Sequence, residues 1–115
     1  MIIPSQPAPS GVQNDIHRAI YDVIATRHVA EIEEAPGRTR VGEPHDYGML
    51  NGKPILLFFQ TSGYSKSGGL PQWRHLDTTK IRGVRPLERT FRGGRDLESG
   101  GEHRQWDALF IRARQ

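Results

Sequence analysis

Short apolar runs broken by turn residues fill much of this chain, and this pattern is typical of a small β protein. A different pattern comes first. Between Asn14 and Ala25 apolar residues recur at helical spacing behind a capping-type residue. They are Ile16, Ala19, Ile20, Val23 and Ile24. We therefore predict one amphipathic helix that covers a face of a sheet, preceded by a flexible or loosely docked arm over residues 1–13.

Five strands are predicted after the helix. They cover residues 29–33, 39–50 with an interruption at Pro44, 55–59, 72–76 and 80–87. Proline cannot donate to a strand ladder, so Pro44 marks an edge or a bend. Pro36-Gly37 indicates a turn, and Asn51-Gly52 predicts a tight hairpin because both residues accept positive φ. The expected fold is mainly β, an α+β arrangement of one helix and one small sheet or barrel.

The tail, residues 100–115, is ambiguous. Its apolar residues Trp106, Leu109, Phe110 and Ala113 match a helical stripe, and a strand over residues 109–113 is the alternative. We expect a terminal helix. The chain then divides into the arm, one domain over residues 14–92 and an extension over residues 93–115.

Charge is distributed unevenly along the chain. The 115 residues carry a net charge of +3, but residues 1–50 hold four Lys/Arg against seven Asp/Glu, and residues 51–115 hold twelve against six. Thirteen of the sixteen cations are arginine, which binds carboxylates and phosphates through a bidentate fork and stacks on bases. The cationic second half favours an anionic partner, with a solvated basic surface as the alternative.

Composition also excludes several classes of protein. Cysteine is absent, so neither a disulfide framework nor a thiolate metal site can form, and a reducing cytoplasm is the expected location. The first residues lack the features of a signal peptide, and no apolar run is long enough to span a membrane. The histidines lack metal-ligand spacing, and no phosphate-loop motif occurs. We expect no membrane contact, no bound metal and no cofactor.

The order of several short motifs resembles that of the bacterial WYL domain. The motifs are Arg40-Val41-x-Glu43-Pro44-His45, the Asn51-Gly52 hairpin with the apolar strand after it, Trp73-Arg74-x-Leu76 and Lys80-Ile81. The resemblance covers residues 15–92. In that family an Arg-x-Val-x-Pro element, the Trp-Tyr-Leu strand and a closing Arg-x-Phe-x-x-x-Arg-Ile motif form a small barrel. In this chain the Trp-Tyr-Leu tripeptide is replaced, near Pro54-Ile55-Leu56, and Lys80 replaces the second arginine of the closing motif.

The resemblance implies a fold and a role. The implied fold is a five-stranded Sm-like or SH3-like barrel. WYL domains generally follow a winged helix-turn-helix in transcription regulators, where they are thought to sense a ligand, often a nucleotide or nucleic acid. The predicted helix before the barrel is too short to read DNA, so we expect a stand-alone WYL-like protein.

Arg40, Arg74 and Lys80 are the predicted ligand-binding cations. They match the basic positions of the family pattern, and a small barrel brings neighbouring strands to one mouth. Three cations there would bind phosphates with a strong salt dependence. The alternative is that Arg40 and Arg74 pair with Glu43, Asp77 or Glu31 on the sheet surface. A longer basic run from Lys80 to Arg95 predicts either a stripe for the same ligand or a charged, protected edge strand.

Aromatic residues and one histidine complete the candidate ligand site. Tyr64 and Trp73 lie in and just after a glycine- and serine-rich segment, residues 63–69, which we call the glycine loop. Aromatic rings near arginines suit base stacking on single strands. A core or loop-anchoring position for Trp73 is the alternative. His45 beside Asp46 suits acid–base chemistry, but no nucleophile accompanies the pair. We expect His45 to make a structural hydrogen bond near the ligand, and we assign no catalytic residue.

Three hypotheses of function follow. The preferred one is a non-enzymatic regulatory module that binds an anionic ligand, a nucleotide or a single-stranded nucleic acid, in a basic groove. The alternative is a protein-interaction module that offers an edge strand or apolar patch to a separately encoded regulator. A small hydrolase using His45 and Asp46 comes third. Because a chain of this size has a thin core, a second copy is a further candidate partner.

Overall fold

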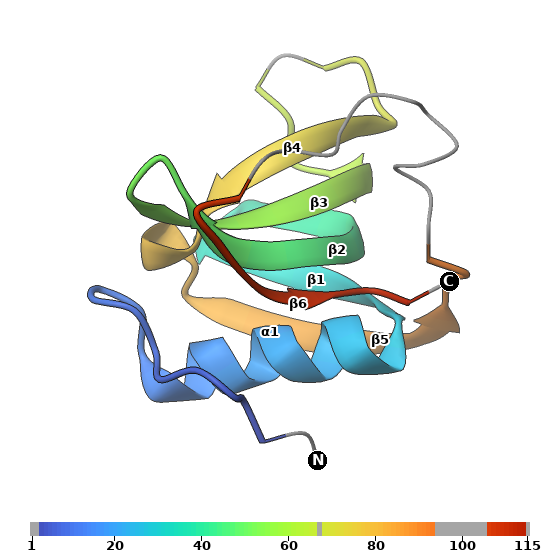
Figure 1. The fold of residues 1–115 in the computed structure, drawn as a ribbon. Coiled ribbons are helices and arrows are strands. Elements are labelled where there is room, and N and C mark those ends of the chain that lie inside the picture. Colours follow the sequence, from blue (N-terminus) through green and yellow to red (C-terminus); the bar gives the residue numbers. More distant parts are fainter. Residues whose placement is uncertain (1–2, 67, 94–105, 115) are drawn as a thin grey trace.

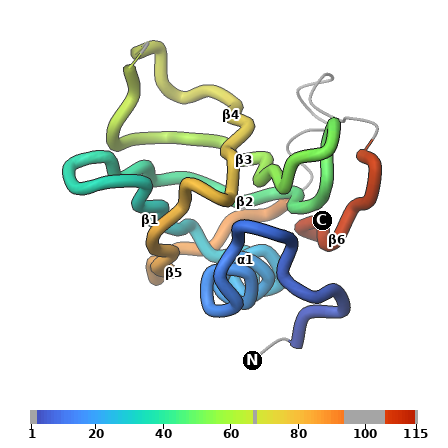
Figure 2. Tube along the Cα trace, turned by 90° about the vertical axis from the view of Figure 1, so that its left-hand side faces the viewer, coloured from blue at the N-terminus to red at the C-terminus, as the bar shows by residue number. Residues whose placement is uncertain are grey.

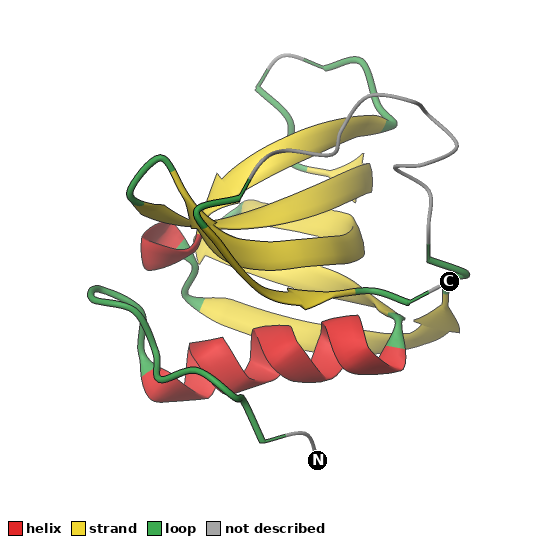
Figure 3. Ribbon diagram, viewed as in Figure 1, coloured by secondary structure: helices red, strands yellow, loops and turns green. Residues whose placement is uncertain are grey.

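The computed structural model describes residues 3–66, 68–93 and 106–114. In chain order the elements are α1 (Asn14–Thr26), β1 (His28–Ala35), β2 (Arg38–Leu50), β3 (Lys53–Gly63), β4 (Gln72–Asp77), the short 3-10 helix η1 (Thr78–Lys80), β5 (Gly83–Thr90) and β6 (Ala108–Arg112). The predicted mainly β fold with one N-terminal helix is confirmed (Figure 3). No helix within the described ranges is long and apolar enough to cross a membrane.

The strands form one antiparallel sheet. Five of them follow the order β4-β3-β2-β1-β5, and β6 pairs with β2 beside this path. Among the described strands no pairing joins β4 to β5, so the sheet is open. Helix α1 lies across one side of the sheet near β5 (Figure 1), and Figure 2, turned by a right angle, looks nearly along the helix.

Strand β2 connects the two parts of the sheet. Its first half pairs with β1 as far as Gly42, and its second half pairs with β6 from Asp46 onward, while β3 follows it on the other side. Register shifts relative to β3 occur between Val41 and Gly42 and between Pro44 and Asp46. Irregularities of this kind bend a strand and tolerate proline. The bend expected at Pro44 therefore lies inside one long strand.

The expected terminal helix is wrong, because residues 108–112 form strand β6. This strand pairs with the second half of β2, beyond the point where β1 stops pairing with it, and Ile111 lies opposite Tyr47. The backbone groups of a buried strand need hydrogen-bond partners, and β6 supplies them to the second half of β2. The Phe110 ring meets the rings of His17 and Tyr47, with centroids 6.1 and 5.2 Å away. Local periodicity cannot register such long-range pairing.

The main core lies between α1 and the sheet. It contains Ile16, Ile20, Tyr21, Val23 and Ile24 of the helix, and Ala30, Ile32, Tyr47, Leu56, Phe58 and Leu76 of the strands. Alternate residues of a strand share a face, so Leu56, Phe58 and Gln60 of β3 line the same side. Gln60 is fully buried. At this position the apolar core gives way to a polar network.

A buried polar contact fastens the N-terminal arm to the core. His17 Nε2 lies 2.7 Å from the carbonyl oxygen of Gln6, and His17 Nδ1 lies 2.7 Å from the Tyr47 hydroxyl. A carbonyl oxygen only accepts, so Nε2 donates to Gln6, and in the neutral ring Nδ1 accepts from Tyr47. Burial, with Tyr21 nearby, raises the pKa of Tyr47 well above its usual range, so the hydroxyl keeps its proton.

Candidate functional site

A pocket of about 540 Å³ opens where β1 ends and β2 begins, beside η1. We call it the cationic pocket. Its lining consists of Arg38, Arg40, Lys80 and Arg82, with Glu34, Ala35 and Thr79. Four cations against one carboxylate in the lining give the space a positive potential that attracts anions.

Three separate segments carry these cations. Arg38 and Arg40 are two residues apart on β2 and therefore share one face of the strand. Lys80 is the last residue of η1, and Arg82 follows just before β5. The backbone N–H of Arg82 donates to the carbonyl of Glu33 at 2.7 Å, which ties this segment to β1. The pocket therefore depends on contacts between residues far apart in sequence.

Asp77 holds η1, and with it Lys80, in place. Its carboxylate accepts from the backbone N–H of Thr79 at 3.0 Å and from the Thr79 hydroxyl at 2.6 Å. Partial burial would raise the pKa of Asp77, but these hydrogen bonds, with Lys80 and Lys53 nearby, hold it below its usual range. The predicted start of the last strand at Lys80 is therefore wrong, since the capped turn ends there and β5 begins at Gly83.

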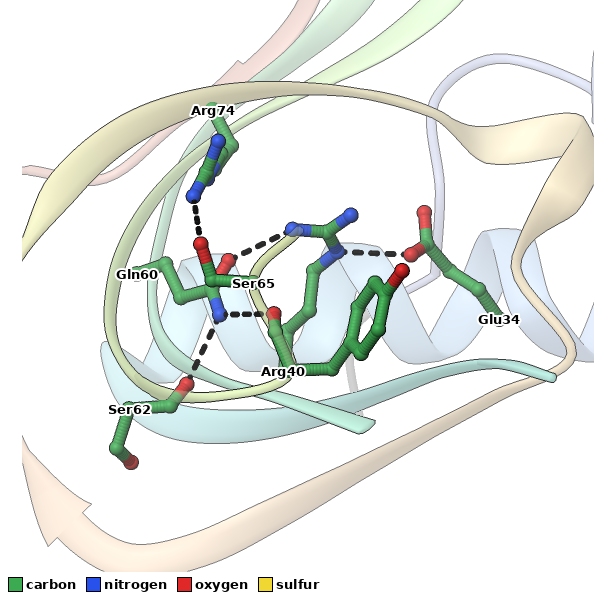
Figure 4. A network of polar contacts seen from close by, with 7 residues as sticks. Glu34, Arg40, Gln60, Ser62, Ser65 and Arg74 are labelled. Atoms are coloured by element: carbon green, nitrogen blue, oxygen red, sulfur yellow. Dashed lines mark hydrogen bonds and ion pairs between the residues drawn. The ribbon is translucent and has the colours of Figure 1, made fainter. Parts of the chain in front are cut away.

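Arg40 is held inside a polar network (Figure 4). Its Nε donates to Glu34 Oε1 at 2.7 Å, and one terminal nitrogen donates to Gln60 Oε1 at 2.9 Å. The Gln60 amide in turn donates to the carbonyls of Ser62 at 3.0 Å and Tyr64 at 2.6 Å. An ion pair does hold Arg40, but its partner is Glu34 and not one of the predicted carboxylates Glu43, Asp77 and Glu31. Arg40 is thus a fixed wall of the cationic pocket.

The other three cations of the pocket differ from Arg40. Arg38, Lys80 and Arg82 are exposed, and no carboxylate in the described part of the chain forms an ion pair with them. The Arg38 guanidinium lies over the Tyr64 ring, 5.2 Å from its centroid. A cation–π contact uses the face of the guanidinium and leaves its N–H donors free to bind an anion.

The structure places two of the three predicted cations together. Arg40 and Lys80 line the cationic pocket, whereas Arg74 on β4 does not. Arg74 donates to the hydroxyl of Ser65 in the glycine loop, and to the Gln72 amide oxygen at 2.9 and 2.8 Å once that amide is oriented to accept. Arg74 therefore holds the glycine loop through Ser65, at the end of the network opposite Glu34 (Figure 4).

The two predicted stacking residues lie apart. Tyr64 donates its backbone N–H to the Thr39 carbonyl at 2.9 Å, and its ring contacts both Arg38 and Arg40. Trp73 instead packs edge-on against His45 and Phe59, with centroids 4.9 and 5.1 Å away. Tyr64 contacts two arginines of the cationic pocket without lining it, whereas Trp73 is half-buried and fits the core or loop-anchoring alternative.

His45 and Asp46 do not pair with each other. The His45 ring, 1% exposed, contacts Trp73 and Phe91, and its Nε2 lies 3.1 Å from Glu43 Oε1. Asp46 forms a two-point ion pair with Arg112 at 3.0 and 3.1 Å. This geometry suits a structural role for His45. Within the described ranges no three His, Asp or Glu side chains gather as metal ligands would.

Sequence reasoning missed two important residues of this region and underrated a third. Arg38 was not singled out, although its spacing from Arg40 on one predicted strand was a usable signal. Gln60 was another signal, because a polar residue follows directly after an apolar run. Arg82 appeared only as one member of the basic run. Its position beside Arg38 depends on the fold and has no local signature.

Comparison with known proteins identifies no relative. No protein-family model, no curated protein and no solved structure matches the chain.

Proposed function

We propose that this protein is a non-enzymatic binding module whose cationic pocket holds a phosphate-bearing ligand, a nucleotide or a single-stranded nucleic acid. The observation that carries the proposal is the convergence on one pocket of Arg38, Lys80 and Arg82, three exposed cations that have no carboxylate partner among the described residues. Phosphate oxygens accept charge-assisted hydrogen bonds from guanidinium and ammonium groups. Arg40, fixed by Glu34 and Gln60, supplies a rigid side to the same space.

The resemblance to the WYL family supports the same proposal. Two basic positions carried over from the family pattern, Arg40 and Lys80, line the cationic pocket. We propose a partly open Sm-like or SH3-like barrel as the fold family, which the long β2 shared between β1 and β6 supports. On this proposal the protein acts as a WYL-like regulatory module in the bacterial cytoplasm.

Removal of two pocket cations tests the proposal. Lys80→Ala combined with Arg82→Ala should weaken binding of a labelled, 5′-phosphorylated single-stranded DNA about tenfold or more, because charge-assisted hydrogen bonds are lost. Fluorescence anisotropy measures the affinity, which should also fall as salt rises. Both side chains are exposed, so the fold should remain intact.

A double variant with the same change in charge is the matched control. Arg18 on α1 and Arg89 on β5 are exposed and do not line the cationic pocket. Arg18→Ala with Arg89→Ala should leave the affinity near that of the wild type. Equal weakening by both double variants would reject the pocket in favour of diffuse attraction to a basic surface.

A largely apolar pocket favours the protein-interaction alternative. Its volume is about 620 Å³, and it lies between α1 and β5, where Ala19, Val23, Pro86 and Leu87 contribute to its lining. Strand β5 ends the order of the described strands, so its outer edge is open to an added strand. An extended peptide that pairs with β5 and places an apolar side chain here should bind equally well at high salt.

A further inference from the structure

A second hollow, of about 310 Å³, adjoins the cationic pocket. The two spaces share Thr79 and Arg82, and the remaining lining of the hollow is Gly11, Gln13 and Ile81. We call it the arm hollow because Gly11 and Gln13 belong to the N-terminal arm. One ligand can therefore extend from the cationic pocket across Arg82 into the arm hollow.

The arm hollow has a different chemical character from the cationic pocket. Arg82, at the border, is the one charged residue in its lining. Gln13 stands at the N-cap of α1 but makes no capping hydrogen bond with its side chain, and it is exposed. Its amide can therefore both donate to and accept from a ligand. The Thr79 hydroxyl already donates to Asp77, so it is left as an acceptor. This lining suits an uncharged group that forms hydrogen bonds.

Contacts within the protein hold the wall of the arm hollow. Val12 is buried and its N–H donates to the Pro9 carbonyl at 3.0 Å. The Gln6 carbonyl is held by His17 at 2.7 Å. Gly11, at φ +86°, packs so closely on η1 that an added Cβ would lie 3.0 Å from Thr79 Cγ2. A preorganised wall binds a ligand without the entropic cost of ordering the arm.

We infer that the ligand is nucleotide-like, with a phosphate held by Arg38, Lys80 and Arg82 and an uncharged, hydrogen-bonding body in the arm hollow against Gln13. The inference rests on the proposed function and narrows its ligand class. A sugar with its base provides such a body, whereas inorganic polyphosphate provides only charge. A free nucleotide and the 5′ end of a single strand share this chemistry.

Two probes that carry the same pair of phosphates distinguish binding of the uncharged body of the ligand from binding of its charge. Isothermal titration calorimetry should show uridine diphosphate binding about fivefold more tightly than pyrophosphate, a difference the size of one neutral hydrogen bond. Gln13→Ala should remove that advantage and leave pyrophosphate binding unchanged. Asn14→Ala is the matched control, because this exposed amide next to Gln13 does not line the hollow, and both affinities should persist.

A third probe identifies the source of the nucleotide. A 5′-phosphorylated tetranucleotide that binds more tightly than uridine diphosphate would point to single strands, and weaker binding would point to a free nucleotide. Equal affinities of wild type for pyrophosphate and uridine diphosphate would overturn the inference, as would equal weakening of both by Gln13→Ala. Those results leave the proposed function standing. Failure of every probe to bind, or binding unaffected by Lys80→Ala with Arg82→Ala, would reject both.

Discussion

Gly63→Ala should lower the free energy of unfolding by about 3 kcal/mol, whereas Gly37→Ala should lower it by only about 1 kcal/mol. Both glycines have positive φ, +90° at Gly63 and +77° at Gly37, so alanine is strained at either position. Their surroundings differ. A Cβ on Gly63 would lie 2.4 Å from the Thr39 carbonyl oxygen, while a Cβ on Gly37 has no atom within 4 Å.

The clash at Gly63 also reaches the candidate site. Gly63 is paired with Arg40 across β2 and β3, and the same Thr39 carbonyl accepts the Tyr64 N–H. Relief of the clash must separate the two strands where Arg40 and the glycine loop meet. Urea denaturation measures the free energy of unfolding of both variants. Gly37→Ala gives the cost of backbone strain alone, so the excess loss in Gly63→Ala is the cost of the clash. Equal destabilisation by the two substitutions would show that β2 and β3 are not closely apposed there.

Gln60→Leu should lower the free energy of unfolding by about 2–3 kcal/mol. Leucine keeps most of the volume, so the loss comes from hydrogen bonding. Three partners lose their contact with Gln60: the Arg40 guanidinium and the carbonyls of Ser62 and Tyr64. Groups left buried without a hydrogen-bond partner are costly, and the cost rises for a charged one.

Thr61→Val is the control for Gln60→Leu on the neighbouring position of β3. Thr61 is exposed, and its hydroxyl makes one hydrogen bond, to the Val41 carbonyl at 3.3 Å. Its replacement should change the free energy of unfolding by less than about 0.5 kcal/mol. Chemical denaturation compares the two variants. A Gln60→Leu variant as stable as Thr61→Val would mean that the buried amide does not hold Arg40 and the loop.

The parts of the fold that the sequence predicts correctly are set by local rules. Helix α1 follows from apolar spacing, and the turn between β2 and β3 follows from two residues that tolerate positive φ. In the structure Asn51 and Gly52 have φ of 52° and 77°. Strand β6 depends instead on its pairing with β2, more than fifty residues earlier. Its apolar pattern fits a helix equally well until that pairing is known.

The candidate site shows the same division between local and long-range information. Basic residues on predicted strands can be read from the sequence, but their partners cannot. Arg40 meets Glu34 because the β1–β2 hairpin brings them together, and Arg74 on β4 reaches Ser65, nine residues earlier in the glycine loop. Only after these contacts are known does it emerge that Arg38, Lys80 and Arg82 have no carboxylate partner in the part of the chain that the structure describes.

The most direct test of the cationic pocket is to map where a ligand binds on the whole protein. An amide nitrogen–proton correlation spectrum, assigned and titrated with uridine diphosphate, reports each backbone N–H separately. The account predicts that the largest shifts occur at Arg38, Thr79, Lys80 and Arg82. Shifts confined to α1 and β5, around the apolar pocket, would contradict it, as would a saturated spectrum in which these four amides do not move.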